Sequence, residues 1–307
     1  MHEFINSRRT CGKIILILLL VNNTYAQELE PRSLVNLPVG TNFIVGGYAY
    51  GQGNILLDPS IPLESFNGKL HTFAIAYLRS ISLFGLSGKV DVVLPYGTGD
   101  WTYNLGGDDY YDKSDGFGDL RVRLSLNFLG APALGPDDYK NYSQKTVAGY
   151  IIQLVVPTGS YKPEQLPNLG SNRWTFRQQL GISHTMKNWI IEGYLALWLF
   201  TENSNFLSGN TFGQKPFMGA KVHLVRILKR GMWLAADAGY GAGGTTIVND
   251  RKLNTHMSTL RFGLNFALPL TEKHTLKFTA VSGVRIERGP DFDAIGVTYQ
   301  YRWFNKK

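Results

Sequence analysis

Four side chains of the types that build a serine hydrolase site occur in the chain: Ser183, His184, His223 and Asp237. Such a site needs the hydroxyl, the imidazole and the carboxylate within hydrogen-bond reach of one another. Ser183 and His184 lie in the stretch GISHT, which is no recognised nucleophile motif, and nothing in the sequence brings the four side chains together. A serine or histidine on a strand is usually structural. We therefore expect no catalytic residues and no enzyme activity.

Two other stretches resemble a metal site or a cofactor site in composition only. DDYYDKSDGFGD carries four carboxylates, at Asp108, Asp109, Asp112 and Asp115, but it lacks the spacing and the terminal glutamate of an EF-hand calcium loop. GYGAGG, at residues 239–244, opens no helical pattern, as a dinucleotide fingerprint would. We expect the acidic stretch to be a solvated surface loop, and we expect no metal and no cofactor.

The remaining ionisable residues follow the period of a strand. In DLRVRLSLNF, residues 119–128, the polar side chains share one parity and the leucines share the other. Successive strand side chains point to opposite faces, so this segment has one polar and one apolar face. If the apolar face meets lipid, the polar face lines a lumen. The residues predicted to line it are Asp119, Arg121, Arg123, Arg177, Lys221, His223, Asp237, Arg261, Lys277 and Arg302.

Two hypotheses account for these residues, and the sequence leaves both open. Cations outnumber anions among them, so the lumen could favour anionic solutes such as aromatic or fatty carboxylates. Alternatively, the same side chains pair with one another and fill a narrow barrel. The basic charge is spread along the chain rather than clustered, which predicts no nucleic-acid partner.

The N-terminus predicts export. Arg8, Arg9 and Lys13 precede the apolar run IILILLLV, and small residues follow it near Ala26, so residues 1–26 are predicted to be a cleaved signal peptide. The run is far shorter than the roughly 20 residues of a membrane-spanning helix. The one cysteine, Cys11, lies in this segment, so the mature chain would contain no disulfide and no cysteine ligand.

Long strands recur after the signal peptide. Most exceed the roughly 9–11 residues that a tilted membrane-spanning strand needs, and the typical soluble strand has only about 5–6 residues. The twelve predicted strands cover residues 41–51, 69–83, 85–96, 116–129, 146–157, 172–184, 189–201, 216–227, 232–241, 257–268, 275–286 and 293–304.

The connections between these strands alternate in length. TMKN, LKRG and LTEK are short turns, and long polar segments such as GTGDWTYNLGGDDYYDKSD and TGSYKPEQLPNLG lie between them. Alternating periplasmic turns and extracellular loops are typical of outer-membrane barrels. Residues 130–144 depart from this alternation, because by count the connection should be a short periplasmic turn and it is long. The sequence predicts an all-β fold, an antiparallel up-and-down transmembrane β-barrel of about twelve strands.

Three motifs in this order resemble a known family. They are PRSLVNLPVGTNFIVGGYAYGQG, SDGFGDLRVRLSLNFLGAPAL and VVPTGSYKPEQLPNLGSNRWTFRQQLGISHT. They are similar to the transporter-like family described as "putative MetA-pathway of phenol degradation", over nearly the whole mature chain. That family comprises outer-membrane barrels distantly similar to long-chain fatty acid and aromatic hydrocarbon channels. In such channels the N-terminal segment plugs the lumen. The resemblance therefore implies that residues 27–40 form an N-terminal segment that could plug the barrel.

The last predicted strand ends in a cluster of aromatic residues. Tyr299, Tyr301, Trp303 and Phe304 gather at its end, as interfacial aromatics do in membrane barrels. Such a strand also resembles the signal that the barrel-assembly machinery recognises, although residues 305–307 extend beyond it as a short tail. We expect one barrel domain, residues 41–304, in the outer membrane of a Gram-negative bacterium, in contact with its lipids.

These observations predict a passive outer-membrane channel or transporter for small hydrophobic or aromatic solutes. Two alternatives stay open. One is an outer-membrane barrel with a structural or adhesive role carried by its long loops. The other is a soluble periplasmic β protein that binds lipophilic ligands.

Overall fold

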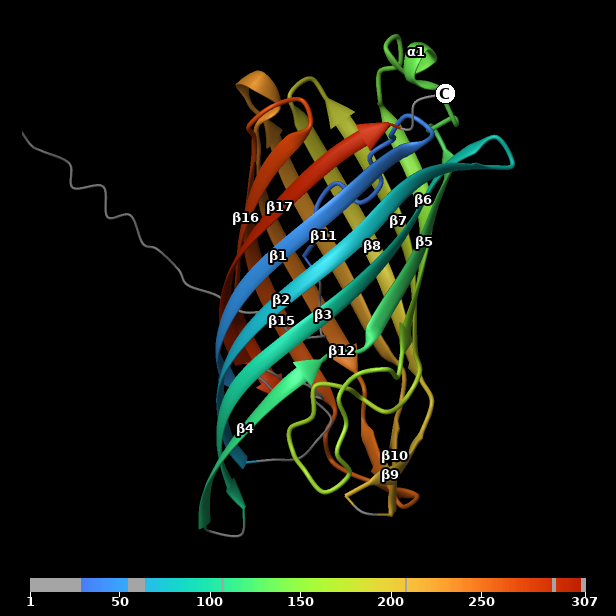
Figure 1. Ribbon diagram of the computed structural model, residues 1–307. Helices are drawn as coiled ribbons and strands as arrows, with labels where there is room; N and C mark the ends of the chain where they lie inside the picture. The colour runs from blue at the N-terminus through green and yellow to red at the C-terminus, as the bar shows by residue number, and fades with distance from the viewer. Residues whose placement is uncertain (1–28, 55–63, 106–107, 208, 289–290, 305–307) are drawn as a thin grey trace, which may run out of the picture.

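The computed structural model describes residues 29–54, 64–105, 108–207, 209–288 and 291–304, and the predicted signal peptide and C-terminal tail lie outside them. The described residues form one closed antiparallel barrel of twelve spanning strands (Figure 1). The ring closes because β3 pairs with β2 on one side and with β4 and β5 on the other. The spanning strands are β1 Thr41–Asn54, β2 Glu64–Leu83, β3 Leu86–Leu105, β4 Asp108–Phe117 with β5 Leu120–Leu129, β6 Thr146–Val156, β7 Thr175–Met186, β8 Trp189–Phe200, β11 Phe217–Ile227, β12 Trp233–Gly243, β15 Met257–Pro269, β16 His274–Arg288 and β17 Asp291–Phe304.

The predicted fold class and strand number are confirmed, but one predicted loop is wrong. Residues 97–105 and 108–115 belong to β3 and β4, which pair with each other and extend the wall towards the end with the long loops, where β3 also pairs with β2. Trp101 is fully buried there and its indole N–H donates to Ser114 Oγ at 2.7 Å, while Tyr103 stacks on Tyr110. The cross-strand aromatic pairs stabilise the hairpin despite its acidic composition. The four aspartates of the predicted surface loop therefore lie on strand β4.

The other loops also contain regular structure. Short strands β9 Asn203–Phe206, β10 Asn210–Gln214, β13 Thr246–Val248 and β14 Arg251–Lys252 form a separate sheet over the end of the barrel that carries the long loops. At the opposite end, a short helix α1, Pro136–Tyr139, lies in the long connection after β5 (Figure 1). A 3-10 turn η1, Lys229–Gly231, joins β11 to β12.

The barrel wall is apolar outside and polar inside. On β8, Leu195 is 64% exposed, whereas its inward neighbour Tyr194 is 3% exposed. On β15, Leu264 is 53% exposed, whereas the inward Arg261 is 1% exposed. An exposed apolar surface of this kind is stable in lipid and not in water, because its contact with water is unfavourable in free energy. The soluble alternative is therefore wrong.

The two ends of the barrel differ. One end carries the short connections, and the first strand begins and the last strand ends there (Figure 1). These connections are the turns at residues 84–85, 187–188 and 270–273 and the 3-10 turn η1. In outer-membrane barrels this end is periplasmic and the long loops are extracellular. No helix among the described residues is long and apolar enough to cross a bilayer.

The outward orientation of β8 can be tested by placing a charge at two depths. Leu195→Arg puts the guanidinium near the middle of the strand, and Ile191→Arg puts it near the periplasmic turn. A lipid-facing arginine costs about 2–4 kcal/mol at the midplane and about 0–1 kcal/mol near an interface. Urea unfolding in phospholipid vesicles should therefore show the larger loss of stability for Leu195→Arg. Equal losses of stability in Leu195→Arg and Ile191→Arg would contradict the depths in the bilayer assigned to these two residues.

Candidate functional site

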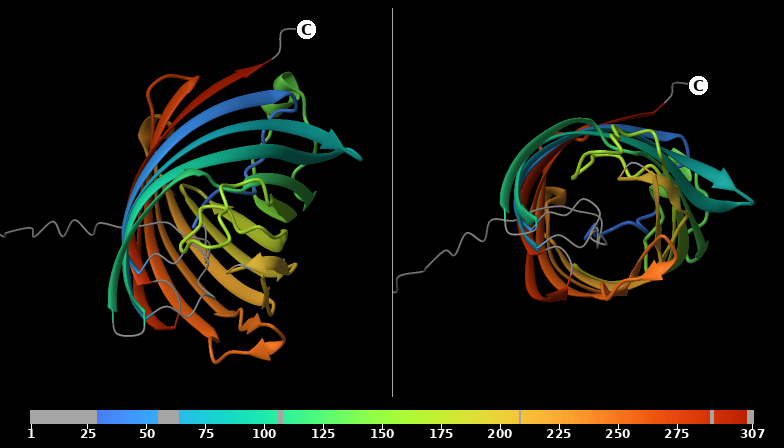
Figure 2. Two further views of the ribbon diagram at one scale, coloured as in Figure 1. Left: turned by 60° about the horizontal axis from the view of Figure 1, so that its bottom comes forward. Right: turned by 90° about the horizontal axis from the view of Figure 1, so that it is seen from below.

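The N-terminal segment before β1 lies inside the ring of strands, as the view along the barrel shows (Figure 2). Its side chains pack against the inner wall. Leu34 is fully buried in a cluster with Val147, Ile151 and Tyr194, and Leu29 is buried against Val281. This short segment is not part of the sheet, so its backbone groups need partners from the wall.

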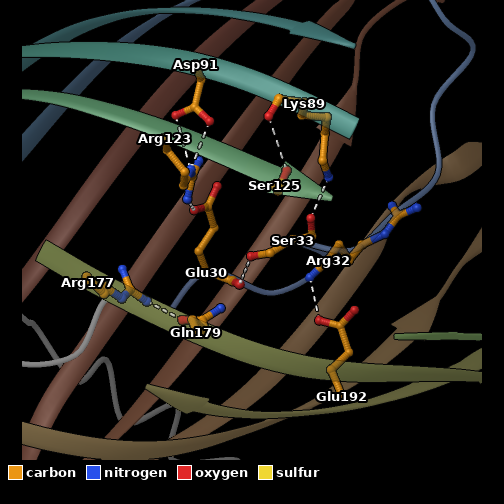
Figure 3. Close-up of polar contacts among 10 residues, drawn as sticks. All are labelled: Glu30, Arg32, Ser33, Lys89, Asp91, Arg123, Ser125, Arg177, Gln179 and Glu192. Atoms are coloured by element: carbon orange, nitrogen blue, oxygen red, sulfur yellow. Dashed lines mark hydrogen bonds and ion pairs between the residues drawn. The ribbon is translucent and has the colours of Figure 1, made fainter. Parts of the chain in front are cut away.

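An ionic contact joins the segment to the wall (Figure 3). Arg123 of β5 donates through Nε to both carboxylate oxygens of Asp91 on β3, at 3.1 and 2.9 Å, and through Nη1 to Glu30 Oε2 at 2.7 Å. Burial would raise the pKa of Glu30, but the positive charges of Arg123, Lys277 and Lys221 outweigh it and hold that pKa well below its ordinary range. Glu30 is therefore a carboxylate in the lumen.

Backbone groups of the segment bind side chains from two more positions on the wall. The Arg32 N–H donates to Glu192 Oε2 on β8 at 2.6 Å. Lys89 of β3 donates through Nζ to the carbonyl of Ser33, and to that of Val35 at 3.3 Å. Because both side chains are charged, these hydrogen bonds are stronger than neutral ones.

Two asparagine side chains extend the same pattern. Asn127 Nδ2 on β5 donates to the Leu34 carbonyl, and Asn265 Nδ2 on β15 donates to the Leu29 carbonyl, both at 3.3 Å. The contacts therefore come from β3, β5, β8 and β15, on several sides of the lumen (Figure 2).

The long connection between β5 and β6 contacts the N-terminal segment. Gln144 accepts from the Asn36 N–H at 2.9 Å, and the Pro132 carbonyl accepts from Asn36 Nδ2 at 3.1 Å. Tyr139, the last residue of α1, donates its hydroxyl to the Asn36 carbonyl at 2.8 Å. This connection departs from the short-turn rhythm because it binds the N-terminal segment at the periplasmic end.

A polar chain runs along the wall from β11 to β16. His223 Nδ1 and Asp237 Oδ1 lie 2.5 Å apart, Asn265 donates to Asp237 Oδ2 at 2.7 Å, and Thr279 donates to Asn265 at 2.8 Å. Among the described residues, neither Ser183 Oγ nor His223 Nε2 has a hydrogen-bond partner. A histidine–aspartate pair thus forms without the serine that a hydrolase requires.

Several predicted lumen residues are buried against aromatic rings. The guanidinium of Arg177 lies 5.1 Å from the ring centre of Trp198, and that of Arg261 lies 3.9 Å from the ring centre of Phe292. Lys221 Nζ lies 5.3 Å from the ring centre of Tyr194. All three cations are nearly inaccessible to solvent, and the ring faces compensate part of their desolvation.

The other predicted residues lie elsewhere around the lumen. The Asp119 carboxylate accepts from the Gly159 N–H and from the N–H and hydroxyl of Ser171, so it holds the extracellular loop after β6. Arg302 donates to the Glu272 carbonyl in a periplasmic turn. Arg121 and Lys277 are partly exposed. The structure therefore brings His223 and Asp237 together, places Arg123, Lys221 and Lys277 around Glu30, and distributes the remaining residues over the wall.

Three of the predicted interfacial aromatics, Tyr299, Tyr301 and Trp303, have the outward parity of β17, whereas Phe304 pairs with the buried Thr41 on the other parity at the end of the strand. Tyr299 and Phe304 are 43% and 42% exposed, and Tyr301 stacks on Trp303 with ring centres 5.6 Å apart. His274 Nδ1 lies 2.5 Å from the Tyr299 hydroxyl. These rings are at the periplasmic half of β17, where a membrane interface belongs.

Sequence reasoning missed the partners of the N-terminal segment. Lys89 and Asp91 alternate with valines in GKVDVVLP, which is the pattern that identified Arg121 and Arg123. Glu192 is the one charge in IIEGYLALWLF, an otherwise apolar strand. Both signals were present in the sequence. The acidic partner from the segment, Glu30, has no such pattern around it.

A family model described as "Putative MetA-pathway of phenol degradation" matches residues 64–281. Among solved structures, the COG4313 outer membrane channel from Pseudomonas putida F1 has a TM-score of 0.75 at 21% identity, and the match covers 90% of this chain and 100% of that one. No curated protein matches the chain.

Two further structures are less similar. The β domain of the Bordetella autotransporter BrkA has a TM-score of 0.48 at 13% identity, covering 85% of this chain and 99% of that chain. The CymD monoaromatic hydrocarbon channel has a TM-score of 0.44 at 10% identity, covering 88% of this chain and 90% of that chain. Of the three, the Pseudomonas channel shares the fold of this chain, which is that of an outer-membrane barrel.

The pKa of Glu30 predicts how acid affects the segment. A carboxylate with a lowered pKa stabilises docking fully above its ordinary value of 4.5, and this contribution is lost as the pH falls towards the lower folded value. A fluorophore on Leu37→Cys reports the mobility of the segment, because the one natural cysteine lies in the predicted signal peptide. Its anisotropy should fall on acidification below pH 4.5.

Glu30→Gln is the matched control, since it removes the titrating group and keeps Asp91 and Arg123 in place. In this variant the anisotropy should be lower at neutral pH and should change little on acidification. An equal acid-induced fall in both proteins would show that another group controls docking.

Proposed function

The chain belongs to the family described as "Putative MetA-pathway of phenol degradation", and from this membership and the barrel we propose that it is a passive outer-membrane channel for small hydrophobic or aromatic compounds. Solutes move down their gradient, and the N-terminal segment acts as a removable plug. The mechanism needs no bound cofactor and no chemical step.

The position of the N-terminal segment carries this proposal. A solute that crosses through the lumen meets residues 29–36, which contact the wall on several sides. The segment is not a strand of the sheet, so it can leave without breaking the barrel. Its main anchors are one ion pair and a set of hydrogen bonds, and it buries only a few apolar side chains.

The chemistry of the extracellular half of the lumen supports the solute class. Arg173 lies 4.6 Å from the ring centre of Phe200 and 4.8 Å from that of Phe212, and Arg177 faces Trp198. Aromatic solutes stack on rings and on guanidinium groups, but here these side chains are nearly buried against one another, so a solute reaches their faces only when they separate. The family description, which refers to phenol degradation, agrees with an aromatic solute.

Deleting the segment tests the proposal. Cells producing a variant without residues 27–37 should take up labelled aromatic acids and neutral aromatics faster than cells producing the intact protein, because the plug is gone. Cells without the protein should show the slowest uptake. Heat-modifiable gel migration checks that the variant barrel folds.

The structural or adhesive alternative predicts a different result. If the barrel has no transport role, uptake stays at the level of cells without the protein for every solute tested. Glu30→Gln gives a milder version of the same comparison, since it weakens one anchor and leaves the barrel wall unchanged.

Arginine substitutions separate selectivity from plug anchoring. Arg123 pairs with Asp91 and Glu30, so we expect Arg123→Gln to loosen the plug and to raise uptake of neutral and anionic aromatics alike. Arg121→Gln should lower the preference for anionic solutes if the basic lumen selects them. Uptake ratios of benzoate to toluene in the two variants measure this. A loss of anion preference in Arg123→Gln without a rise in neutral uptake would contradict its anchoring role.

A further inference from the structure

The outer face of β17, β1 and β2 carries two hollows, one apolar and one polar. These three strands are neighbours at the front of the barrel (Figure 1). Residues directly opposite each other on antiparallel strands share a face, so the strand register defines horizontal rows of outward side chains. The outward rows on β1 are centred on Gly46, Tyr48, Tyr50 and Gln52, in order from the membrane interior to the extracellular end.

The row at Gly46 contains a groove in the apolar surface. Gly46 lies between Tyr299 of β17 and Ile75 of β2, and a Cβ atom built on it would meet nothing within 4 Å. The groove has a volume of about 490 Å³, and its walls include Phe73 and Leu94. It is open to the hydrocarbon region, where water cannot fill it, so an apolar chain must occupy it for close packing.

Aromatic side chains continue from the groove towards the extracellular side. The Tyr48 hydroxyl and His71 Nδ1 lie 2.8 Å apart, and the rings of Tyr48 and Phe73 have centres 5.1 Å apart. In the next row, the Tyr50 hydroxyl donates to Gln52 Oε1 at 3.2 Å. Such amphipathic rings mark the level of the membrane interface.

A polar pocket lies directly beyond these rings. Gln52 is flanked by Asp293 of β17 and Lys69 of β2, and Asp293 is paired with Ser282 of β16. The pocket has a volume of about 520 Å³ and also includes Asp291. Lys69 is exposed and forms no ion pair with a described residue. From Gly46 to Gln52 the site extends about 20 Å along the strand.

We propose that this face binds one molecule of an acylated, phosphorylated glycolipid from the outer leaflet. An acyl chain lies in the groove at Gly46, and the head group lies in the pocket at Gln52. Lys69 binds a phosphate, while the carboxylates of Asp291 and Asp293 accept hydrogen bonds from sugar hydroxyls. The site is on the outside of the barrel and is separate from the solute path through the lumen.

The order of the rows identifies the occupant as a lipid of the outer leaflet. The apolar groove, the aromatic belt and the polar pocket follow one another towards the extracellular end, which is the profile of a single lipid in that leaflet. A lipid of the periplasmic leaflet would place its head group at the opposite end of β1, beyond Ile44. A head group with several hydroxyls fits the two carboxylates better than a simple phosphodiester does.

Binding of lipid A, an acylated and bisphosphorylated glucosamine disaccharide, to the folded mature protein in detergent tests the proposal by native mass spectrometry. We expect one lipid A per barrel. The Cβ of Gly46→Leu has open space, so its side chain extends into the groove and should weaken binding about tenfold, the loss expected for about two buried methylene groups. Lys69→Gln should weaken binding several-fold by removing the contact to phosphate.

Two variants elsewhere on the barrel serve as matched controls. Gly193 is an outward glycine on β8 whose Cβ would also have open space, with its nearest neighbour at 4.0 Å, so Gly193→Leu should leave binding unchanged. Lys273 is exposed at the periplasmic end, and Lys273→Gln should also have no effect. Heat-modifiable migration confirms that each variant is folded.

Three results would overturn the proposal. Equal lipid A binding by Gly46→Leu and Gly193→Leu would exclude the groove. Equal binding of phosphatidylglycerol and lipid A by the wild-type protein would exclude the proposed head-group pocket. Dimers that disappear in Gly46→Leu would show that a second barrel, and not a lipid, covers this face.

Discussion

The alternation of side chains across one closed sheet is the constraint on which the whole structure depends. Every strand residue points either to lipid or to the lumen, so one polar residue on the wrong parity would face hydrocarbon. The same alternation collects ionisable side chains inside a ring of only twelve strands. These groups must be paired, because a buried charge without a partner costs far more than a paired one.

The N-terminal segment helps to satisfy this demand. Glu30 supplies a negative charge to Arg123, and the segment carbonyls accept hydrogen bonds from Lys89, Asn127 and Asn265. Side chains of the wall form hydrogen bonds with backbone groups of the segment, which is not paired with a strand. The lumen and the segment are therefore complementary, and the polar interior has a structural role as well as any role in choosing solutes. Arg123 is a test case for both hypotheses about the lumen charges, because it pairs with Asp91 and Glu30 and is also one of the cations that could select anionic solutes.

The sequence alone was enough for the barrel and insufficient for its interior contacts. The period of two and the lengths of the connections identified the spanning strands, because both properties are local. The acidic and glycine-rich composition of residues 97–115 predicts a loop, because it hides the cross-strand contacts of Trp101 with Ser114 and of Tyr103 with Tyr110. Glu30 and Arg123 are separated by 93 positions in the chain, and only the closed barrel brings them together. The groove at Gly46 likewise depends on the register of three strands.

A reversible covalent tether between the segment and the wall tests the removable plug most directly. Thiols at Arg32→Cys and Glu192→Cys replace two residues that lie close because the Arg32 backbone N–H donates to Glu192 Oε2, and the mature chain would have no other cysteine. Uptake of a labelled aromatic solute is measured with the tether oxidised and again after reduction. A removable plug predicts that uptake stops when the tether is closed and returns when it is reduced. Equal uptake in both states would contradict it.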